Sequence, residues 1–141
     1  MLNLSDIRRL YVRKKAGFRQ GEESLTAELK EVLGDRIEGC GIYHRYDVDG
    51  LSGEDYEKAV STVFSEPPVD SVETELPKGD LVIGVDFLPG QYAQRADSAE
   101  QCLAIVTGKD GARVRCALVY SFDGDFAEGG REKLLTFLVN P

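Results

Sequence analysis

Residues 8–34 read RRLYVRKKAGFRQGEESLTAELKEVLG, and residues 81–108 read LVIGVDFLPGQYAQRADSAEQCLAIVTG. Each stretch begins with a short apolar run, passes through a turn that contains glycine, and continues into a segment whose apolar residues recur every three or four positions. This order predicts a β-strand followed by an α-helix, twice in one chain. An internal repeat of this kind constrains the whole architecture.

The match between the two copies continues toward the end of the chain. Leu10 and Val12 match Ile83 and Val85 at one constant offset. The later matches are Cys40 with Cys116, Ile42 with Leu118, Tyr46 with Phe122, Asp47 with Asp123, and Pro67 with Pro141. We therefore predict a tandem duplication of a β-α-β-α unit, with repeat 1 over about residues 8–67 and repeat 2 over about 81–141 of one domain, residues 1–141.

The periodicity within each copy places the elements. Alternating or continuous apolar runs predict strands at 9–14, 40–46, 81–87 and 114–122. Apolar stripes predict four helices, carried by Leu25, Leu29, Val32 and Leu33; by Tyr56, Ala59, Val60, Val63 and Phe64; by Ala99, Cys102, Leu103 and Val106; and by Leu134, Leu135 and Leu138. The expected fold is α+β: a four-stranded mixed or antiparallel sheet backed by four helices, with the copies related by a pseudo-twofold axis. The acidic stretch 65–80 is expected to be an exposed, mostly extended linker between the copies.

Composition limits the partners. The 141 residues carry a net charge of −8, and an acidic surface repels phosphate backbones, so no nucleic-acid partner is expected. No apolar run is long enough to span a bilayer, and the first residues lack the layout of a secretion signal, which predicts a cytoplasmic protein without a membrane partner. Cys40, Cys102 and Cys116 are each expected in the core, and His44 is the only histidine.

No complete catalytic, metal-binding or cofactor-binding motif is found in the sequence. The segment Gly108–Gly111 lacks the spacing and the hydroxyl of a phosphate-binding loop. The aspartates of 47–50 and 123–125 are expected in turns, because a calcium loop needs more oxygen ligands over twelve residues. We therefore expect neither a cofactor nor catalytic activity in this chain alone.

Two polar segments are candidates for contact with a partner. Residues 8–19 hold six cations, among them Lys14, Lys15 and Arg19, which either form a solvated surface or bind a phosphate or an acidic partner. The second segment, 88–102, is a strand-to-helix turn whose polar candidates are Tyr92, Gln94, Arg95, Asp97 and Ser98. Asp97 or Ser98 can cap the following helix, and Gln94 and Arg95 either belong to that turn alone or face a partner or ligand.

Three segments together resemble a known family. LPGQYAQRADSAEQC (88–102), RYDVDGL (45–51) and TVFSEPPVD (62–70) are similar to the N-terminal domain of the long, single-chain phosphoribosylformylglycinamidine synthases of purine biosynthesis. The similarity runs from about Arg8 to Pro141, and Ala93 stands where the family pattern has aspartate. In that family the N-terminal domain looks like two fused copies of PurS, the small structural subunit that split versions of the enzyme use as a dimer.

The resemblance implies a part in a larger enzyme. The family converts formylglycinamide ribonucleotide, ATP and glutamine to formylglycinamidine ribonucleotide, ADP, phosphate and glutamate. Its synthetase and glutaminase domains, which use ATP, magnesium and glutamine, would follow Pro141. The expected role is a noncatalytic structural domain whose partners are those two domains of the same polypeptide. The candidate docking residues are Tyr92, Gln94, Arg95, Asp97, Ser98, Lys14, Lys15 and Arg19. The isolated piece is expected to be capable of forming a homodimer, and the alternative is a free-standing module that binds a small regulatory molecule.

Overall fold

The computed structural model describes residues 7–86, 94–127 and 129–139. The elements follow in the order β1 (Arg8–Lys14), α1 (Gln20–Leu33), β2 (Ile37–Asp49), α2 (Gly53–Ala59), β3 (Asp70–Glu73), β4 (Leu81–Asp86), α3 (Gln94–Thr107), β5 (Arg113–Gly124) and α4 (Gly130–Val139). A single π-helical turn, Val60–Phe64, continues α2. All four predicted helices and all four predicted strands are present within about three residues of their expected bounds.

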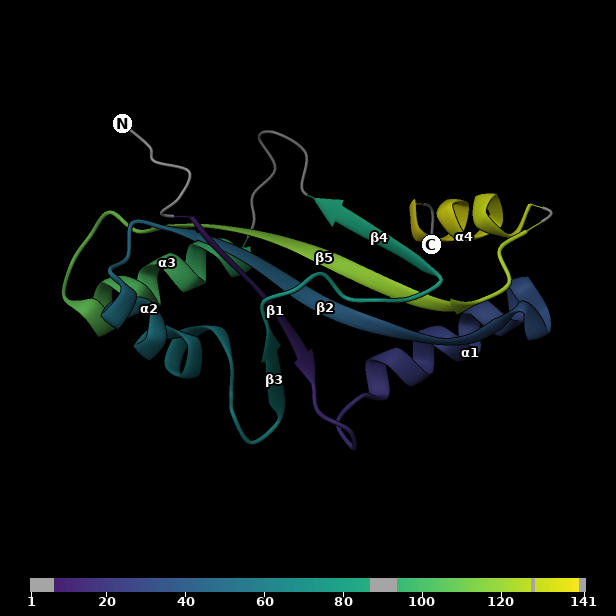
Figure 1. The fold of residues 1–141 in the computed structure, drawn as a ribbon, viewed down its shortest axis with the longest axis horizontal. Coiled ribbons are helices and arrows are strands. Elements are labelled where there is room, and N and C mark those ends of the chain that lie inside the picture. Colours follow the sequence, from purple (N-terminus) through teal and green to yellow (C-terminus); the bar gives the residue numbers. More distant parts are fainter. Residues whose placement is uncertain (1–6, 87–93, 128, 140–141) are drawn as a thin grey trace.

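The strands form one antiparallel sheet in the order β3-β1-β2-β5-β4 (Figure 1). The predicted α+β class is confirmed, but the predicted number of four strands is wrong. The fifth strand, β3, lies inside the segment 65–80 that we expected to be only a linker, and it pairs with β1 at the sheet edge. Its sequence, DSVE, contains a single apolar residue, which is common in short edge strands and leaves no periodic signal.

The two longest strands form the middle of the sheet. β2 pairs with β5 from Asp49 opposite Arg113 to Ile37 opposite Gly124, and Tyr43 lies opposite Val119 near the centre of this ladder. Both strands extend past their predicted ends at 40–46 and 114–122. The ladder therefore spans the length of the molecule and carries the remaining elements on either side (Figure 1).

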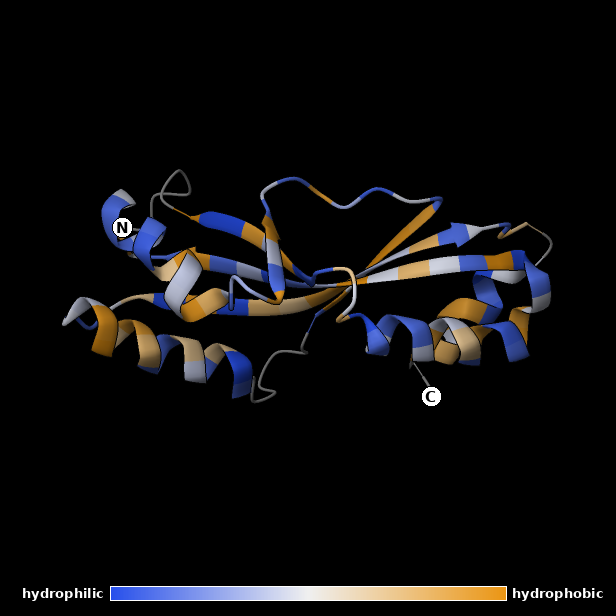
Figure 2. Ribbon diagram, turned by 90° about the horizontal axis from the view of Figure 1, so that it is seen from below, coloured by the Kyte–Doolittle hydropathy of each residue, from blue (hydrophilic) through white to orange (hydrophobic). Residues whose placement is uncertain are grey.

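All four helices pack on one face of the sheet, in two separate groups. One core combines α2 and α3 with the strands through Tyr56, Ala59, Ala99, Leu103 and Tyr46. The other combines α1 and α4 through residues such as Leu29, Leu33, Phe122 and Leu134. Each core thus contains one helix from each half of the chain, and the groups lie at opposite ends of the sheet (Figures 1 and 2).

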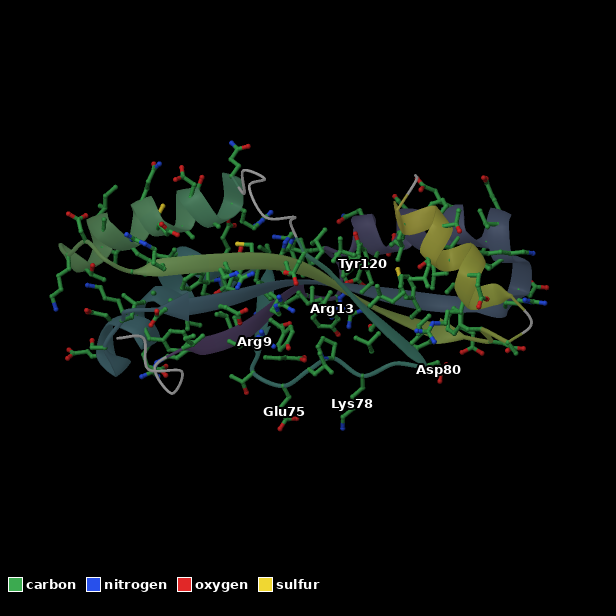
Figure 3. All side chains as sticks on the ribbon, turned by 90° about the horizontal axis from the view of Figure 1, so that it is seen from above. Arg9, Arg13, Glu75, Lys78, Asp80 and Tyr120 are labelled. Carbon is green, nitrogen blue, oxygen red and sulfur yellow. The ribbon has the colours of Figure 1, made fainter. Side chains whose placement is uncertain are left out.

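The opposite face of the sheet is crossed by the chain between β3 and β4 (Figures 2 and 3). Tyr11, Tyr43 and Val119 form a small buried cluster, and Val82 of β4 packs against it. Pro77 in the crossover is buried, whereas the labelled side chains of Glu75 and Lys78 point away from the sheet (Figure 3). The segment is largely exposed, as expected, apart from the buried Pro77.

Some side chains predicted in the core lie at the surface. Cys102 is exposed and Cys40 is half-buried, so only Cys116 fits the expected core cysteine. Val32 is 43% exposed although it belongs to the predicted stripe of α1. Because α1 contacts the sheet and α4 over a narrow strip, residues at the margin of the stripe remain in solvent.

The proposed cap of α3 is also wrong. The helix begins at Gln94, before Asp97 and Ser98, so neither residue occupies the position that precedes the first turn. Asp97 instead accepts a hydrogen bond from the Gln101 side chain one turn later, at 2.8 Å. The helix α3 therefore begins earlier in the sequence than predicted.

Gly41 on β2 provides a test of packing at the centre of the sheet. A Cβ atom there would lie 2.8 Å from Ser121 Oγ and 2.9 Å from Tyr43 Cε1. We expect Gly41→Ala to lower the free energy of unfolding by about 1–3 kcal/mol, measured by urea denaturation. The control is Gly39→Ala on the same strand, where a Cβ would meet nothing within 4 Å. Equal effects of the two substitutions would contradict this account of the packing.

Candidate functional site: a cationic pocket between the helix groups

Three of the predicted docking residues meet at one pocket. Lys14 at the end of β1, Arg19 just before α1, and Arg95 in the first turn of α3 line a cavity of about 320 Å³. The three residues come from two segments about 80 positions apart in the chain. The fold therefore joins the two polar segments that the sequence identified separately.

The other predicted docking residues lie elsewhere. Lys15 is exposed in the turn after β1, and Asp97 faces Gln101 on α3. Gln94 and Ser98 line a neighbouring groove between α3 and the end of α2, together with Arg95. Tyr92 is outside the described residues.

The walls of the pocket are built by the sheet and the helix groups. Val12 and Ile42 supply apolar surface from β1 and β2, and Phe64 supplies it from the π-helical turn. Phe18, on the turn before α1, also lines the cavity and is 48% exposed. The pocket has an apolar floor and an aromatic side chain accessible to solvent.

The cations in the pocket differ in their partners. Lys14 Nζ lies 2.9 Å from Asp70 Oδ1, and this ion pair joins β1 to the edge strand β3. Arg19 Nε donates a hydrogen bond to the Lys14 carbonyl oxygen at 2.7 Å, and Arg95 Nη1 donates one to the Tyr46 hydroxyl at 3.1 Å. In the described part of the chain, neither Arg19 nor Arg95 forms an ion pair with a carboxylate. Two guanidinium charges are thus available in a protein of net charge −8.

His44, the sole histidine, lies half-buried in the same pocket. Its pKa is lowered from 6.5 to about 4, mainly by burial and also by the positive charges of Arg95 and Lys14, while the negative charge of Asp70 acts in the opposite direction. The imidazole is therefore neutral at pH 7 and offers one donor and one acceptor nitrogen. No sequence pattern connects this histidine with Arg95.

A buried ion pair holds the start of α1 beside the pocket. Both carboxylate oxygens of Glu22 accept hydrogen bonds from Arg13, at 2.8 and 2.7 Å, and one of them also accepts from the Ile42 amide at 3.0 Å. The hydrogen bond to Glu22 raises the pKa of Arg13 above its ordinary value, against the opposing effect of burial. The pairing of β1 with β2 ends at His44, so the Ile42 amide of β2 hydrogen-bonds with Glu22 and not with β1. This contact and the ion pair fix the start of α1 against the sheet.

The sheet face opposite the helices carries a second set of charges. Arg9 forms a two-point hydrogen bond with Asp47, at 2.6 and 3.0 Å, and Arg45 pairs with Asp86 at 2.9 Å. Arg45 reaches from β2 to β4 across β5, where the intervening position is Ala117. Arg9 and Arg45 are therefore already paired with carboxylates, unlike Arg19 and Arg95 in the described part of the chain.

Comparison with protein-family models, curated proteins and solved structures finds no match for this chain. Within residues 7–86, 94–127 and 129–139, no group of three or more His, Cys, Asp or Glu side chains is arranged to hold a metal ion. Over the same residues, no helix has both the length and the apolar character needed to cross a membrane. The functional argument therefore depends on the geometry of the cationic pocket.

Glu22→Gln tests whether the buried ion pair holds the site. We expect it to lower the free energy of unfolding by about 3 kcal/mol, because it leaves the Arg13 guanidinium without a counter-charge in a partly buried position. The control is Glu23→Gln, the adjacent exposed carboxylate on the same helix turn, with an expected change below about 0.5 kcal/mol. Chemical denaturation of both variants measures the difference, and similar values for the two would exclude a structural role for the pair.

The lowered pKa of His44 predicts a dependence of stability on pH. In the unfolded chain the imidazole binds a proton as the pH falls through about 6.5, whereas in the folded chain it does so only near 4. Stability is therefore unaffected above this window and decreases as the pH falls from 6.5 to 4. The loss is on the order of 1–2 kcal/mol, less than the full shift implies because the side chain is only partly shielded from solvent. The free energy of unfolding of His44→Gln should decrease less over this window, and parallel pH curves for the two proteins would contradict the prediction.

Proposed function

We propose that this chain is a noncatalytic structural domain of a phosphoribosylformylglycinamidine synthase, docking onto the synthetase and glutaminase parts and supporting ammonia transfer between them. The observation that carries the proposal is the assembly of Lys14, Arg19 and Arg95 at one pocket. These residues belong to the two segments that the sequence marks as docking candidates. An accessible cluster of cations on an otherwise acidic protein suits contact with an acidic partner surface.

The sheet order supports the comparison with two fused PurS-like copies. The four strands β1-β2-β5-β4 place the proposed repeats side by side, with their second strands paired antiparallel at the centre. This is the arrangement that two identical subunits related by a twofold axis would form. The exchange of helices between the two cores is also typical of a tight pairing of two copies.

The outer strand pairs differ between the proposed repeats. Leu10 lies opposite Tyr46, whereas its sequence match Ile83 lies opposite Tyr120, two residues from the match of Tyr46. A shift of two residues keeps every side chain on the same face of the sheet, so the shift is compatible with a common ancestor for the halves. β3 belongs only to the first half of the sheet.

A rigid scaffold domain can contribute to an enzyme even when it supplies no reacting group itself. Transfer of ammonia from one site to another requires that the two sites have a fixed relative position and are shielded from water. A domain with two helix groups on one long sheet can contact two other domains at once (Figure 1). Its contribution to the reaction is then the placement of those domains.

The pocket also favours a second candidate function, a module that binds a small regulatory molecule. The cavity lies between elements of both halves and has cations without carboxylate partners in the described part of the chain. A ligand that binds only the folded state raises the unfolding midpoint. Thermal shift measurements with purine nucleotides and amino acids therefore separate this function from a purely structural one.

Arg95→Ala tests the docking surface. We expect it to weaken binding of this chain to a long-form synthase polypeptide that lacks its own N-terminal domain by about tenfold or more, measured by calorimetry. The control, Arg131→Ala, removes an exposed arginine of α4 away from the pocket and should bind like the unaltered chain. Circular dichroism checks that both variants fold. Equal binding by the two variants would remove Arg95 from the docking surface, and no binding by the unaltered chain would refute the proposed function.

A further inference from the structure

We propose that the pocket lined by Arg95, Arg19 and His44 is a binding site for a small oxyanion, a phosphate or a carboxylate. This inference goes beyond the structural role proposed above and does not depend on it, because the residues that carry it all lie in the described part of this chain. It names a ligand class for the second candidate function. The pocket takes residues from β1, β2, α1, α3 and the π-helical turn, so it exists only in the assembled fold.

The guanidinium of Arg95 is positioned by one hydrogen bond and has further N–H donors that are not used in it. Its Nη1 atom donates to the Tyr46 hydroxyl at 3.1 Å, and Tyr46 is itself 4% exposed and packed against the ring of Phe64 at 4.9 Å between centroids. A guanidinium has five N–H donors, and this is its one hydrogen bond to another described residue. The remaining donors match the two oxygens of a carboxylate or phosphate.

The carboxylates of the pocket do not cancel this charge. Glu22 is bound by Arg13, and Asp70 is paired with Lys14. Arg19 forms its hydrogen bond with a neutral carbonyl oxygen, so its charge adds to that of Arg95. The unbalanced charge at the pocket is thus positive, in contrast to the net charge of −8 for the whole chain.

His44 and the pocket shape fit the same ligand class. His44 lines the same cavity as Arg95, Arg19 and Lys14. A bound anion would supply the opposite charge and favour protonation of that ring. A volume of about 320 Å³ with apolar walls suits a small molecule, and the partly exposed Phe18 can pack against an apolar part of it.

The single histidine makes the test direct, because its imidazole gives one assignable NMR signal in the pocket. The intact 141-residue chain is titrated with inorganic phosphate, sodium acetate and AMP at constant ionic strength and pH 7. We expect a saturable shift of the His44 signal with at least one of these anions and a rise of the His44 pKa when the anion is bound. The three probes distinguish free phosphate, a carboxylate, and a phosphate carried on a nucleotide.

Variants connect the signal to the pocket. Arg95→Gln should weaken the binding at least about tenfold, as expected for loss of charge-assisted hydrogen bonds, whereas Arg131→Gln should leave it unchanged. Absence of a saturable shift with all three anions would overturn the proposal, as would equal affinities of the two variants. Failure of this titration leaves the docking measurement intact, so the oxyanion site and the structural role are judged separately.

Discussion

The long antiparallel pairing of β2 with β5 organises the whole fold. These two strands join the halves of the chain over a ladder that runs from Asp49 opposite Arg113 to Ile37 opposite Gly124. Every other element is attached to this ladder directly or through one neighbour. In an antiparallel pair, the start of one strand lies beside the end of the other. The helix before β2, α1, therefore meets the helix after β5, α4, and the helix after β2, α2, meets the helix before β5, α3. Neither half can bury its helices without the other.

The same pairing creates the candidate site. The helix groups occupy the two ends of the sheet and leave the middle of that face to the starts of α1 and α3 and the end of β1 (Figure 1). The positive ends of two helices and the three cations Lys14, Arg19 and Arg95 thus lie around one pocket. The buried Arg13–Glu22 pair holds one side of it, with Glu22 bonded to the Ile42 amide of β2. The cationic pocket is a consequence of how the sheet is assembled, and a local motif could not produce it.

The two faces of the sheet use charge differently. On the face without helices, Arg9 is paired with Asp47 on the neighbouring strand, and Arg45 is paired with Asp86 two strands away. On the helical face, Arg19 and Arg95 have no carboxylate partner in the described part of the chain. Paired charges stabilise a surface modestly, whereas unpaired cations in a pocket with apolar walls are suited to binding an anion. Arg19 and Arg95 therefore make the helical face the better candidate for binding an anion.

Apolar periodicity and turn residues are local properties of the chain, and they were enough to predict the four helices, the strands β1, β2, β4 and β5, and the α+β class. The sequence also marked Lys14, Arg19 and Arg95 as candidates, because cations in an acidic chain and polar residues at a strand-to-helix turn can be recognised without a structure. Three features could not be predicted in this way: the pairing of β3 with the sheet, the exposure of Cys102, and the placement of His44 in the same pocket as Arg95. All three features depend on long-range packing, which leaves no periodic pattern in the sequence. They are the pairing of an edge strand with one apolar residue, the exposure of a residue at the margin of a helix stripe, and the contact of side chains that are distant in the chain.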